Sequence, residues 1–181
     1  MAIIHLLTDL KTHVERRSSR ERAIFVAGGT LALVLLLADQ FSKIWAERSL
    51  APHNRVIEVI PSFFNLRFAT NKGAAWGIFD GHTLPLFLVA VVVLAAAAFY
   101  FRRLAEGWPE RYYALLIILS GVVGNAFDRL WRGHVVDFLD FVFGTYHFPT
   151  FNIADSAICC GAAIYLLSSW LRPNGNKGDR E

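Results

Sequence analysis

Four long apolar runs dominate this sequence and limit what it can fold into. They lie at residues 23–38, 84–101, 112–127 and 153–171, and the only charged residue within them is Asp155. A helix that crosses a lipid bilayer needs about 17–25 residues, and each run reaches that length with a few flanking residues. A bundle of soluble helices would need polar outer faces, for which the runs supply almost no residues. We therefore expect four membrane-spanning helices, at about 23–41, 84–101, 112–128 and 153–171.

The balance of residue types agrees with a membrane protein. Hydrophobic residues make up 55% of the 181 residues and charged residues only 18%, whereas soluble domains average about 25% charged residues. That excess excludes a disordered chain and a soluble nucleic-acid-binding module. The two cysteines, Cys159 and Cys160, are neighbours inside an apolar run and so make no disulfide framework.

Lysine and arginine residues predict how the chain is oriented. Eleven of them lie before the first run, between the second and third runs, or after the fourth, and seven lie in the other two connections. The positive-inside rule then places both termini in the cytoplasm. We expect a cytoplasmic basic arm at 1–22, a single membrane domain at 23–171 and a cytoplasmic tail at 172–181. The net charge of +3 fits contact with membrane lipids rather than nucleic acid.

The two extracytoplasmic connections carry strand-like patterns. Residues 55–60 and 63–68 are rich in β-branched and aromatic residues and are separated by Pro61, and residues 135–143 are similar. The stretch 71–77 has the small residues of a turn. The predicted fold is therefore an all-α membrane protein with a small extracytoplasmic β element and a short interfacial loop or helix.

Four aspartates lie at or near the outer ends of the predicted spans: Asp39, Asp128, Asp137 and Asp155. An ionisable group near the membrane is costly, so it is a functional candidate by default. Asp39 precedes Lys43 by four residues, which on a helix predicts a structural ion pair.

Asn125, Asp128 and Arg129 share one face of the third helix. Spacing alone leaves two interpretations of this face equally open. One is polar contact between helices, and the other is a polar wall that positions a substrate backbone.

Asp137 and Asp155 have ordinary explanations when each is taken alone. Asp137 fits an exposed strand position, and Asp155 lies in the first turn of a helix that Asn152 would cap. Both, however, lie at the outer face, and the 17 residues between them can fold back and bring them together. Two neighbouring carboxylates cannot both ionise easily. Such a pair supplies a general acid and a general base around one water, which can hydrolyse a peptide bond.

Competing chemistries have little support in the sequence. The six histidines show no spacing typical of metal ligands, and there is no G-x-S-x-G motif or glycine-rich phosphate loop. Cys159 and Cys160 have no charged neighbour that would activate a thiol. We expect neither a metal nor a cofactor.

Five motifs, in order, resemble those of the lipoprotein signal peptidases, the type II signal peptidases of bacteria. The resemblance covers residues 23–171. The motifs are DQFSK at 39–43, NKGAAWG at 71–77, GNAFDR at 124–129, VVDF at 135–138 and FNIAD at 151–155.

The resemblance implies an aspartyl peptidase in the bacterial inner membrane. It would act, as a monomer with its site toward the extracytoplasmic face, on prolipoproteins whose signal-peptide cysteine carries diacylglycerol, cutting just before that cysteine. Asp137 and Asp155 would be the catalytic pair, and Asp39 and Lys43 would be structural. Asp128 would be oriented by Arg129. The residues that would bind substrate or shape the site are Asn71, Gly73, Asn125, Asp128, Arg129, Asn152 and Ala154.

Two other functions are considered. A small ion or proton-coupled transporter could relay protons through Asp128 and Asp155, but it predicts internal pseudo-symmetry, and no convincing repeat is present. A non-enzymatic assembly factor could use Ser120-x-x-x-Gly124 for helix packing, which leaves the outer carboxylates unexplained. Whether residues 146–151 move as a lid stays open.

Overall fold

The computed structural model describes residues 2–73 and 81–172, with side chains at residue 19, 21–73 and 81–172. Its four long helices are α1 (Ala2–Ser49), α2 (Thr83–Ala105), α3 (Pro109–Trp131) and α4 (Ile153–Leu171). Each is long and apolar enough to cross a bilayer, α1 over its Glu21–Ser49 part. The four predicted spans and the all-α membrane fold with a small β element are thus confirmed.

Three helices extend beyond their predicted bounds. Helix α2, expected at 84–101, runs from Thr83 to Ala105. Helix α1 was expected at about 23–41 but runs from Ala2 to Ser49, because no proline interrupts the sequence on either side of its apolar run. Helix α3 begins three residues earlier than expected, at Pro109, where a proline suits the first turn of a helix. Asp39 and Lys43 therefore lie well inside α1 rather than at its end.

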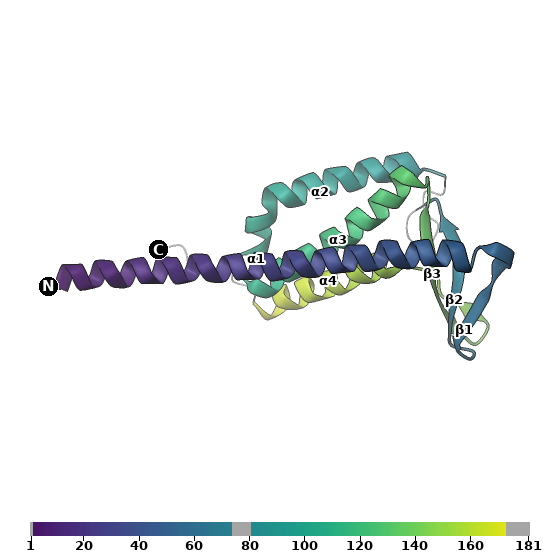
Figure 1. Cartoon of the computed structure of the whole chain (residues 1–181), viewed down its shortest axis with the longest axis horizontal. Helices are drawn as coiled ribbons and strands as arrows, with labels where there is room; N and C mark the ends of the chain where they lie inside the picture. Colours follow the sequence, from purple (N-terminus) through teal and green to yellow (C-terminus); the bar gives the residue numbers. More distant parts are fainter. Residues whose placement is uncertain (1, 74–80, 173–181) are drawn as a thin grey trace.

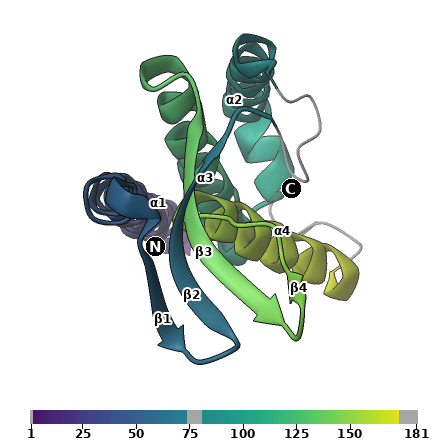
Figure 2. The same ribbon diagram turned by 90° about the vertical axis from the view of Figure 1, so that its right-hand side faces the viewer.

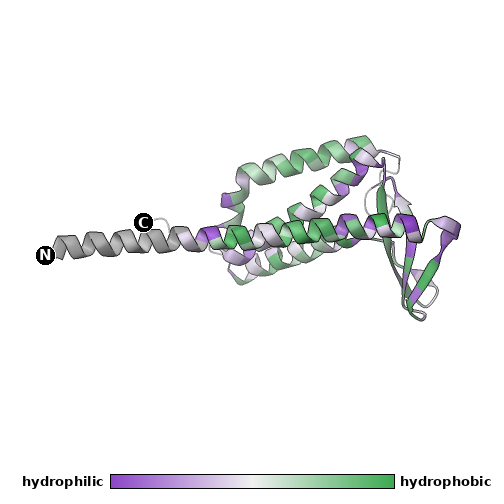
Figure 3. Ribbon diagram, in the orientation of Figure 1, coloured by the Kyte–Doolittle hydropathy of each residue, from purple (hydrophilic) through white to green (hydrophobic). Residues whose placement is uncertain are grey.

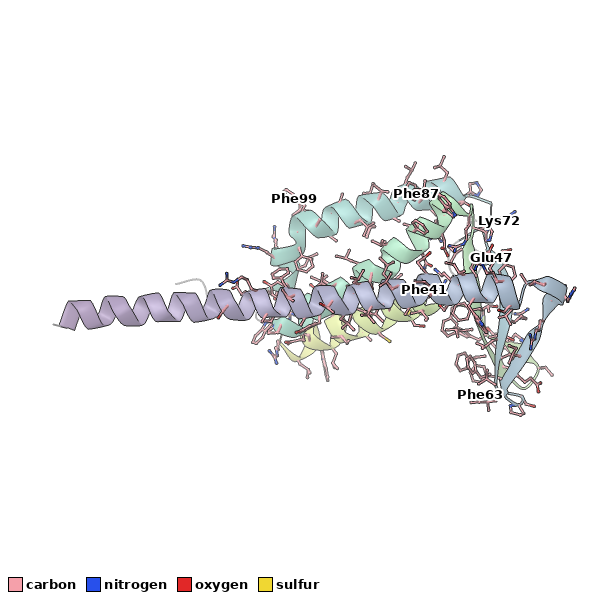
Figure 4. The ribbon with its side chains drawn as sticks, in the orientation of Figure 1. Phe41, Glu47, Phe63, Lys72, Phe87 and Phe99 are labelled. Atoms are coloured by element: carbon pink, nitrogen blue, oxygen red, sulfur yellow. The ribbon has the colours of Figure 1, made fainter. Side chains whose placement is uncertain are left out.

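Helix α3 is the centre of the bundle and packs against the other three helices. Its contact with α4 is close because both helices carry glycine there: a Cβ on Gly121 would lie 2.3 Å from the Ala154 oxygen, and one on Gly161 would lie 2.8 Å from the Ala114 oxygen. Helix α2 packs on α3 and is otherwise largely exposed, with apolar side chains such as Phe99 directed away from the bundle (Figures 1 and 4). The outer faces of the helices are mainly apolar (Figure 3), as a lipid environment requires.

A four-stranded antiparallel sheet lies at one end of the bundle, which we call the sheet end (Figures 1 and 2). Its strands, in spatial order, are β1 (Val56–Ile60), β2 (Phe64–Asn71), β3 (Val135–Phe143) and β4 (Tyr146–His147). The strands predicted at 55–60, 63–68 and 135–143 are confirmed. Ala46 of α1 and Leu50, just after that helix, pack with Val136 and Phe138 of β3, so an apolar core fixes the sheet against the helices.

The opposite end of the bundle is held by Arg111, which is almost fully buried. Its guanidinium donates to the Ser168 hydroxyl at 3.1 Å and to the Arg172 carbonyl at 3.0 Å, and it pairs with Glu106. This arginine therefore joins the ends of α2, α3 and α4. Apart from Arg172, the tail expected at 172–181 lies outside the described residues.

Candidate functional site

The structure gathers the residues singled out in the sequence at the sheet end of the bundle. They come from α1, β2 and the residues just after it, α3, β3 and the start of α4. These residues are Asp39, Lys43, Asn71, Gly73, Asn125, Asp128, Arg129, Asp137, Asn152, Ala154 and Asp155. Of the predicted turn at 71–77, residues 74–77 lie outside the described residues.

Asn152 joins the two aspartates of interest. Its side-chain oxygen accepts from the Asp155 backbone N–H at 2.9 Å, and its own backbone N–H donates to Asp155 Oδ2 at 3.3 Å, which is a complete capping box. The predicted N-cap is thus confirmed. The same side chain also donates through Nδ2 to Asp137 Oδ1 at 2.7 Å. A neutral amide, fully buried, therefore lies between Asp137 and Asp155.

Asn125 of α3 holds the other side of Asp155. Its Nδ2 donates to Asp155 Oδ1 at 2.7 Å, and its Oδ1 accepts from Lys43 Nζ at 2.9 Å and from Asn152 Nδ2 at 3.3 Å. Only this orientation of the amide satisfies both neighbours, because an ammonium can only donate and a carboxylate can only accept. Asn125 therefore fixes Asp155 from the helix bundle.

Asn71 and Arg129 border Asp137 from the other direction. Asn71 Nδ2 donates to Asp137 Oδ2 at 3.3 Å, and its Oδ1 accepts from the Gly73 N–H at 2.9 Å. Arg129 donates through Nη2 to the Gly73 carbonyl at 2.9 Å and through Nη1 to the Asn125 carbonyl at 3.3 Å. The Nε of Arg129 is buried and has no partner among the described residues. This arginine thus links α3 to the turn that follows β2.

The environment of Asp137 favours its protonated form. Burial of the carboxyl group, together with the nearby charge of Asp155, raises the pKa of Asp137 to about 7. Hydrogen bonds from Asn152 and Asn71, and the charge of Lys43, act in the opposite direction but are outweighed. The pair can therefore hold one proton near neutral pH, which is the state needed for paired acid and base chemistry.

A second group of charges, next to the first, pairs two carboxylates with two cations, Lys43 and Arg132. Lys43 Nζ lies 2.8 Å from Asp39 Oδ2 and 3.0 Å from Asp128 Oδ2, and all three side chains are buried. Asp39 Oδ1 also accepts from the Ala154 backbone N–H at 2.8 Å, which fixes the first turn of α4. The ion pair predicted between Asp39 and Lys43 is confirmed.

One detail of the sequence interpretation is wrong. Asp128 was expected to be oriented by Arg129, but it pairs with Arg132 and Lys43 and accepts from the Val136 N–H at 3.3 Å. Arg132 follows Asp128 by one helical turn, so an i, i+4 pattern was present in the sequence. Arg129 lies one residue further round the helix and is directed toward the Gly73 carbonyl instead.

Sequence reasoning gave no role to Asp140 or Gln40. Asp140 is fully buried in β3, and its only sequence signal is an acidic residue within an apolar strand. Gln40 donates to Asp39 Oδ2 at 3.0 Å and to the Gly124 carbonyl at 3.2 Å. No group of three His, Cys, Asp or Glu residues suited to a metal ion occurs within 2–73 and 81–172.

Comparison with known proteins gives consistent matches. A family model described as signal peptidase (SPase) II matches residues 31–171. A lipoprotein signal peptidase of Vibrio cholerae serotype O1 is 42% identical over 153 residues, covering 81% of this chain and 82% of the relative. One of Nitratidesulfovibrio vulgaris is 37% identical over 155 residues, covering 83% of this chain and 93% of the relative.

Solved structures give a similar result. A structure described as that of a bacterial membrane enzyme has a TM-score of 0.75 to this chain at 32% identity. The match covers 87% of this chain and 95% of the solved one. A second bacterial membrane enzyme structure has a TM-score of 0.70, also at 32% identity, and covers 80% of this chain and 93% of its own.

Proposed function

This chain belongs to the bacterial signal peptidase II family, and from that premise we propose that it is an aspartyl endopeptidase with Asp137 and Asp155 as its catalytic pair. Its substrates are prolipoproteins whose signal-peptide cysteine carries diacylglycerol, and it cuts the bond before that cysteine. The observation that supports this most is the buried Asn152 amide, which contacts Asp137 through its side chain and Asp155 through both side chain and backbone.

The reaction follows from one proton shared by two carboxyl groups. The ionised carboxylate takes a proton from water as the water oxygen forms a bond to the scissile carbonyl carbon. The protonated carboxyl group donates to the carbonyl oxygen, giving a neutral tetrahedral intermediate. When the C–N bond breaks, the carboxyl group that took the proton from water donates it to the departing amine nitrogen. One hydroxyl of the tetrahedral intermediate returns its proton to the other carboxylate as the carbonyl of the new carboxyl product forms, so the pair again shares one proton. No metal or covalent intermediate is needed.

Other residues of the site would hold the substrate. Arg129 Nε is a buried donor without a partner in the described part of the chain, suited to a substrate carbonyl. Gly73 donates to Asn71, which contacts Asp137, and accepts from Arg129. The buried Ala154 shapes the site from α4 by donating its N–H to Asp39. All of these groups come from one chain, which supports action as a monomer. The unequal distribution of lysine and arginine supports cytoplasmic termini and an extracytoplasmic site.

Purified full-length protein in lipid bicelles, supplied with a diacylglyceryl-modified precursor peptide, tests the proposal. We expect one cut, before the modified cysteine, and no cut in the unmodified peptide. Asp137→Asn and Asp155→Asn should each lower the rate at least about 1000-fold, as loss of an essential acid or base does, and a chelator should leave the rate unchanged.

Glu58→Gln is the matched control for these variants. It makes the same acid-to-amide change at an exposed position of β1 and should leave the rate as it is. Normal cleavage by either aspartate variant, once correctly inserted, would show that the catalytic assignment is wrong.

A further inference from the structure

Asp140 is a buried carboxylate that the proposed chemistry does not use. It lies three residues after Asp137 in β3 and is fully buried. His147 Nδ1 contacts its Oδ1 at 3.0 Å, Asn65 Nδ2 donates to Oδ2 at 3.3 Å and Arg67 Nη2 donates to Oδ1 at 3.4 Å. Burial alone would raise the pKa of Asp140, but these donors and charges outweigh it and lower the pKa. Asp140 is therefore ionised and held by groups from β2 and β4.

The same cluster reaches the segment that leads into α4. Arg67 Nη2 also donates to Thr150 Oγ1 at 3.1 Å, so one guanidinium contacts both Asp140 and the residue two positions before Asn152. The backbone of Phe151 then accepts from Phe138 N at 3.0 Å and Leu139 N at 2.9 Å, and donates to the Leu139 carbonyl at 3.1 Å. Thr150 and Phe151 are thus fixed to β3 between Asp137 and Asp140.

We propose that Asp140, Arg67 and Thr150 form a clamp that positions the Asn152 amide between Asp137 and Asp155. The proposal rests on the function proposed above and names positioning residues for that reaction. His147 supports the clamp by contacting Asp140 from β4. None of these side chains touches the reacting atoms, and each acts through the path of the chain into Asn152.

Directional polar contacts suit this role better than apolar packing. Apolar packing is non-directional, whereas a catalytic group has to be held within about 0.5 Å of its productive position. A buried carboxylate also makes its donors obligatory, because loss of one leaves the charge poorly compensated. The segment at 144–149 is largely exposed. The chain returns to β3 through the polar contact of Thr150 with Arg67 and through the stacking of Phe151 on Phe141 of β3. The lid considered for 146–151 is therefore tied to β3 at both ends.

The pH dependence of cleavage separates positioning from general stability. The hydrogen bond from Asn152 lowers the pKa of Asp137, so a displaced amide lets that pKa rise. The charged groups that face Asp137 are Asp155 of α4, Lys43 of α1 and Arg129 of α3, and the clamp variants alter none of them. Loosening the clamp should move the alkaline limb of the pH–rate profile to higher pH. Partial unfolding would lower the rate at every pH and leave the position of the limb unchanged.

Thr150→Val tests the clamp by removing one acceptor with little change in shape. We expect kcat to fall roughly tenfold, the rate equivalent of one hydrogen bond to a charged group, with KM little changed and the alkaline limb shifted upward. Thr150→Ser keeps the hydroxyl and should restore both. Thr145→Val makes the same substitution at the exposed turn between β3 and β4 and should behave as the unmodified protein does.

Asp140→Asn provides the stronger test. The asparagine side chain keeps one acceptor oxygen, but its NH2 group would face the donors that now surround the carboxylate. We expect kcat to fall about 100-fold, the scale of a misplaced catalytic group. If Thr150→Val keeps the normal kcat and the normal pH profile while the unmodified protein cleaves its peptide, the clamp is wrong and the proposed function stands. If the unmodified protein itself fails to cleave, the proposed function is wrong.

Discussion

Two pairs of aspartates lie side by side at the sheet end, and they differ in what stands between them. Asp39 and Asp128 share the ammonium of Lys43, at 2.8 Å and 3.0 Å. Asp137 and Asp155 share the neutral side chain and backbone of Asn152. A cation balances the charge of neighbouring carboxylates, whereas a neutral amide orients them and leaves a proton to be shared. The first pair is therefore structural and the second is suited to chemistry.

Asn125 connects the two pairs. Its oxygen accepts from Lys43 and its nitrogen donates to Asp155, so the compensated pair supports the reactive one through a single amide. Asp39 also supports the reactive pair, because it accepts from the Ala154 N–H in the first turn of α4, next to Asp155. Nearby carboxylates therefore acquire different roles from the charge of the donor that they share. Substitutions in either pair and the pH dependence of stability test this difference.

Asp137→Asn should separate activity from stability. Cleavage should fall at least about 1000-fold, equivalent to about 4 kcal/mol of activation free energy, because the shared proton is lost. The melting temperature in detergent should stay or rise, since a costly buried carboxylate is removed. Asp128→Asn should lower the melting temperature instead, because Lys43 and Arg132 lose a partner. Equal melting temperatures for the two variants would contradict the comparison.

Lys43→Met should lower the free energy of unfolding, because Asp39 and Asp128 lose the ammonium that they share. Removing one partner of a buried ion pair costs about 3–5 kcal/mol, and here two carboxylates lose the same ammonium. The loss would be measured as the denaturant midpoint in mixed micelles. The double variant Lys43→Met with Asp39→Asn restores the charge balance and should recover part of the stability. A double variant less stable than Lys43→Met would show that charge is not what holds this pair.

Stability should depend on pH through Asp137. Its folded pKa of about 7 lies above the unfolded value of about 4, so the folded state binds the proton more tightly. The contribution is complete below about pH 4 and falls by about 1.4 kcal/mol per pH unit up to about pH 7. Melting curves from pH 4 to 8 should show this decline, and Asp137→Asn should be flatter. Parallel curves for the two proteins would contradict the raised pKa.

Gly124→Ala on α3 should lower the free energy of unfolding by displacing the Asp39 carboxylate. A Cβ at this position would lie 2.7 Å from Asp39 Oδ2, so the carboxylate has to move away from Lys43 or from the Ala154 N–H. We expect a loss of about 1–3 kcal/mol, as for other overpacked sites. Gly29→Ala is the control, because a Cβ there meets nothing within 4 Å and favours the helix. Equal stability of the two variants would argue against a tight Asp39 site.

Local patterns predicted the elements well. The fourth helix at 153–171 and the strand at 135–143 have the bounds expected of them, because an apolar run and a β-branched stretch report directly on local conformation. The ends of α1 were missed, since the helix continues through polar residues that its apolar run does not mark. The ion pair and the N-cap were predictable because each involves residues within one helical turn.

Contacts between distant segments were beyond such patterns. The sequence pattern around Asp140 is that of an ordinary strand residue. Its contacts with Asn65 and Arg67 arise only from the pairing of β2 with β3. Arg129 was assigned to Asp128 because the two are adjacent in sequence, but adjacent helical residues diverge by about 100° around the axis. The turn after β2 takes Arg129, and Arg132 takes Asp128.

Four helices long and apolar enough to cross a membrane are predictable from local patterns, as are the positions of Asp39, Asp128 and Asp155 near the ends of the apolar runs. Those properties depend on composition and local spacing, which the chain carries whatever its fold. Which aspartates share a cation and which share an amide depends on the folded arrangement instead. That choice depends on contacts between residues 82 and 30 positions apart, Lys43 with Asn125 and Asn125 with Asp155, and these are set by how α3 packs against its neighbours.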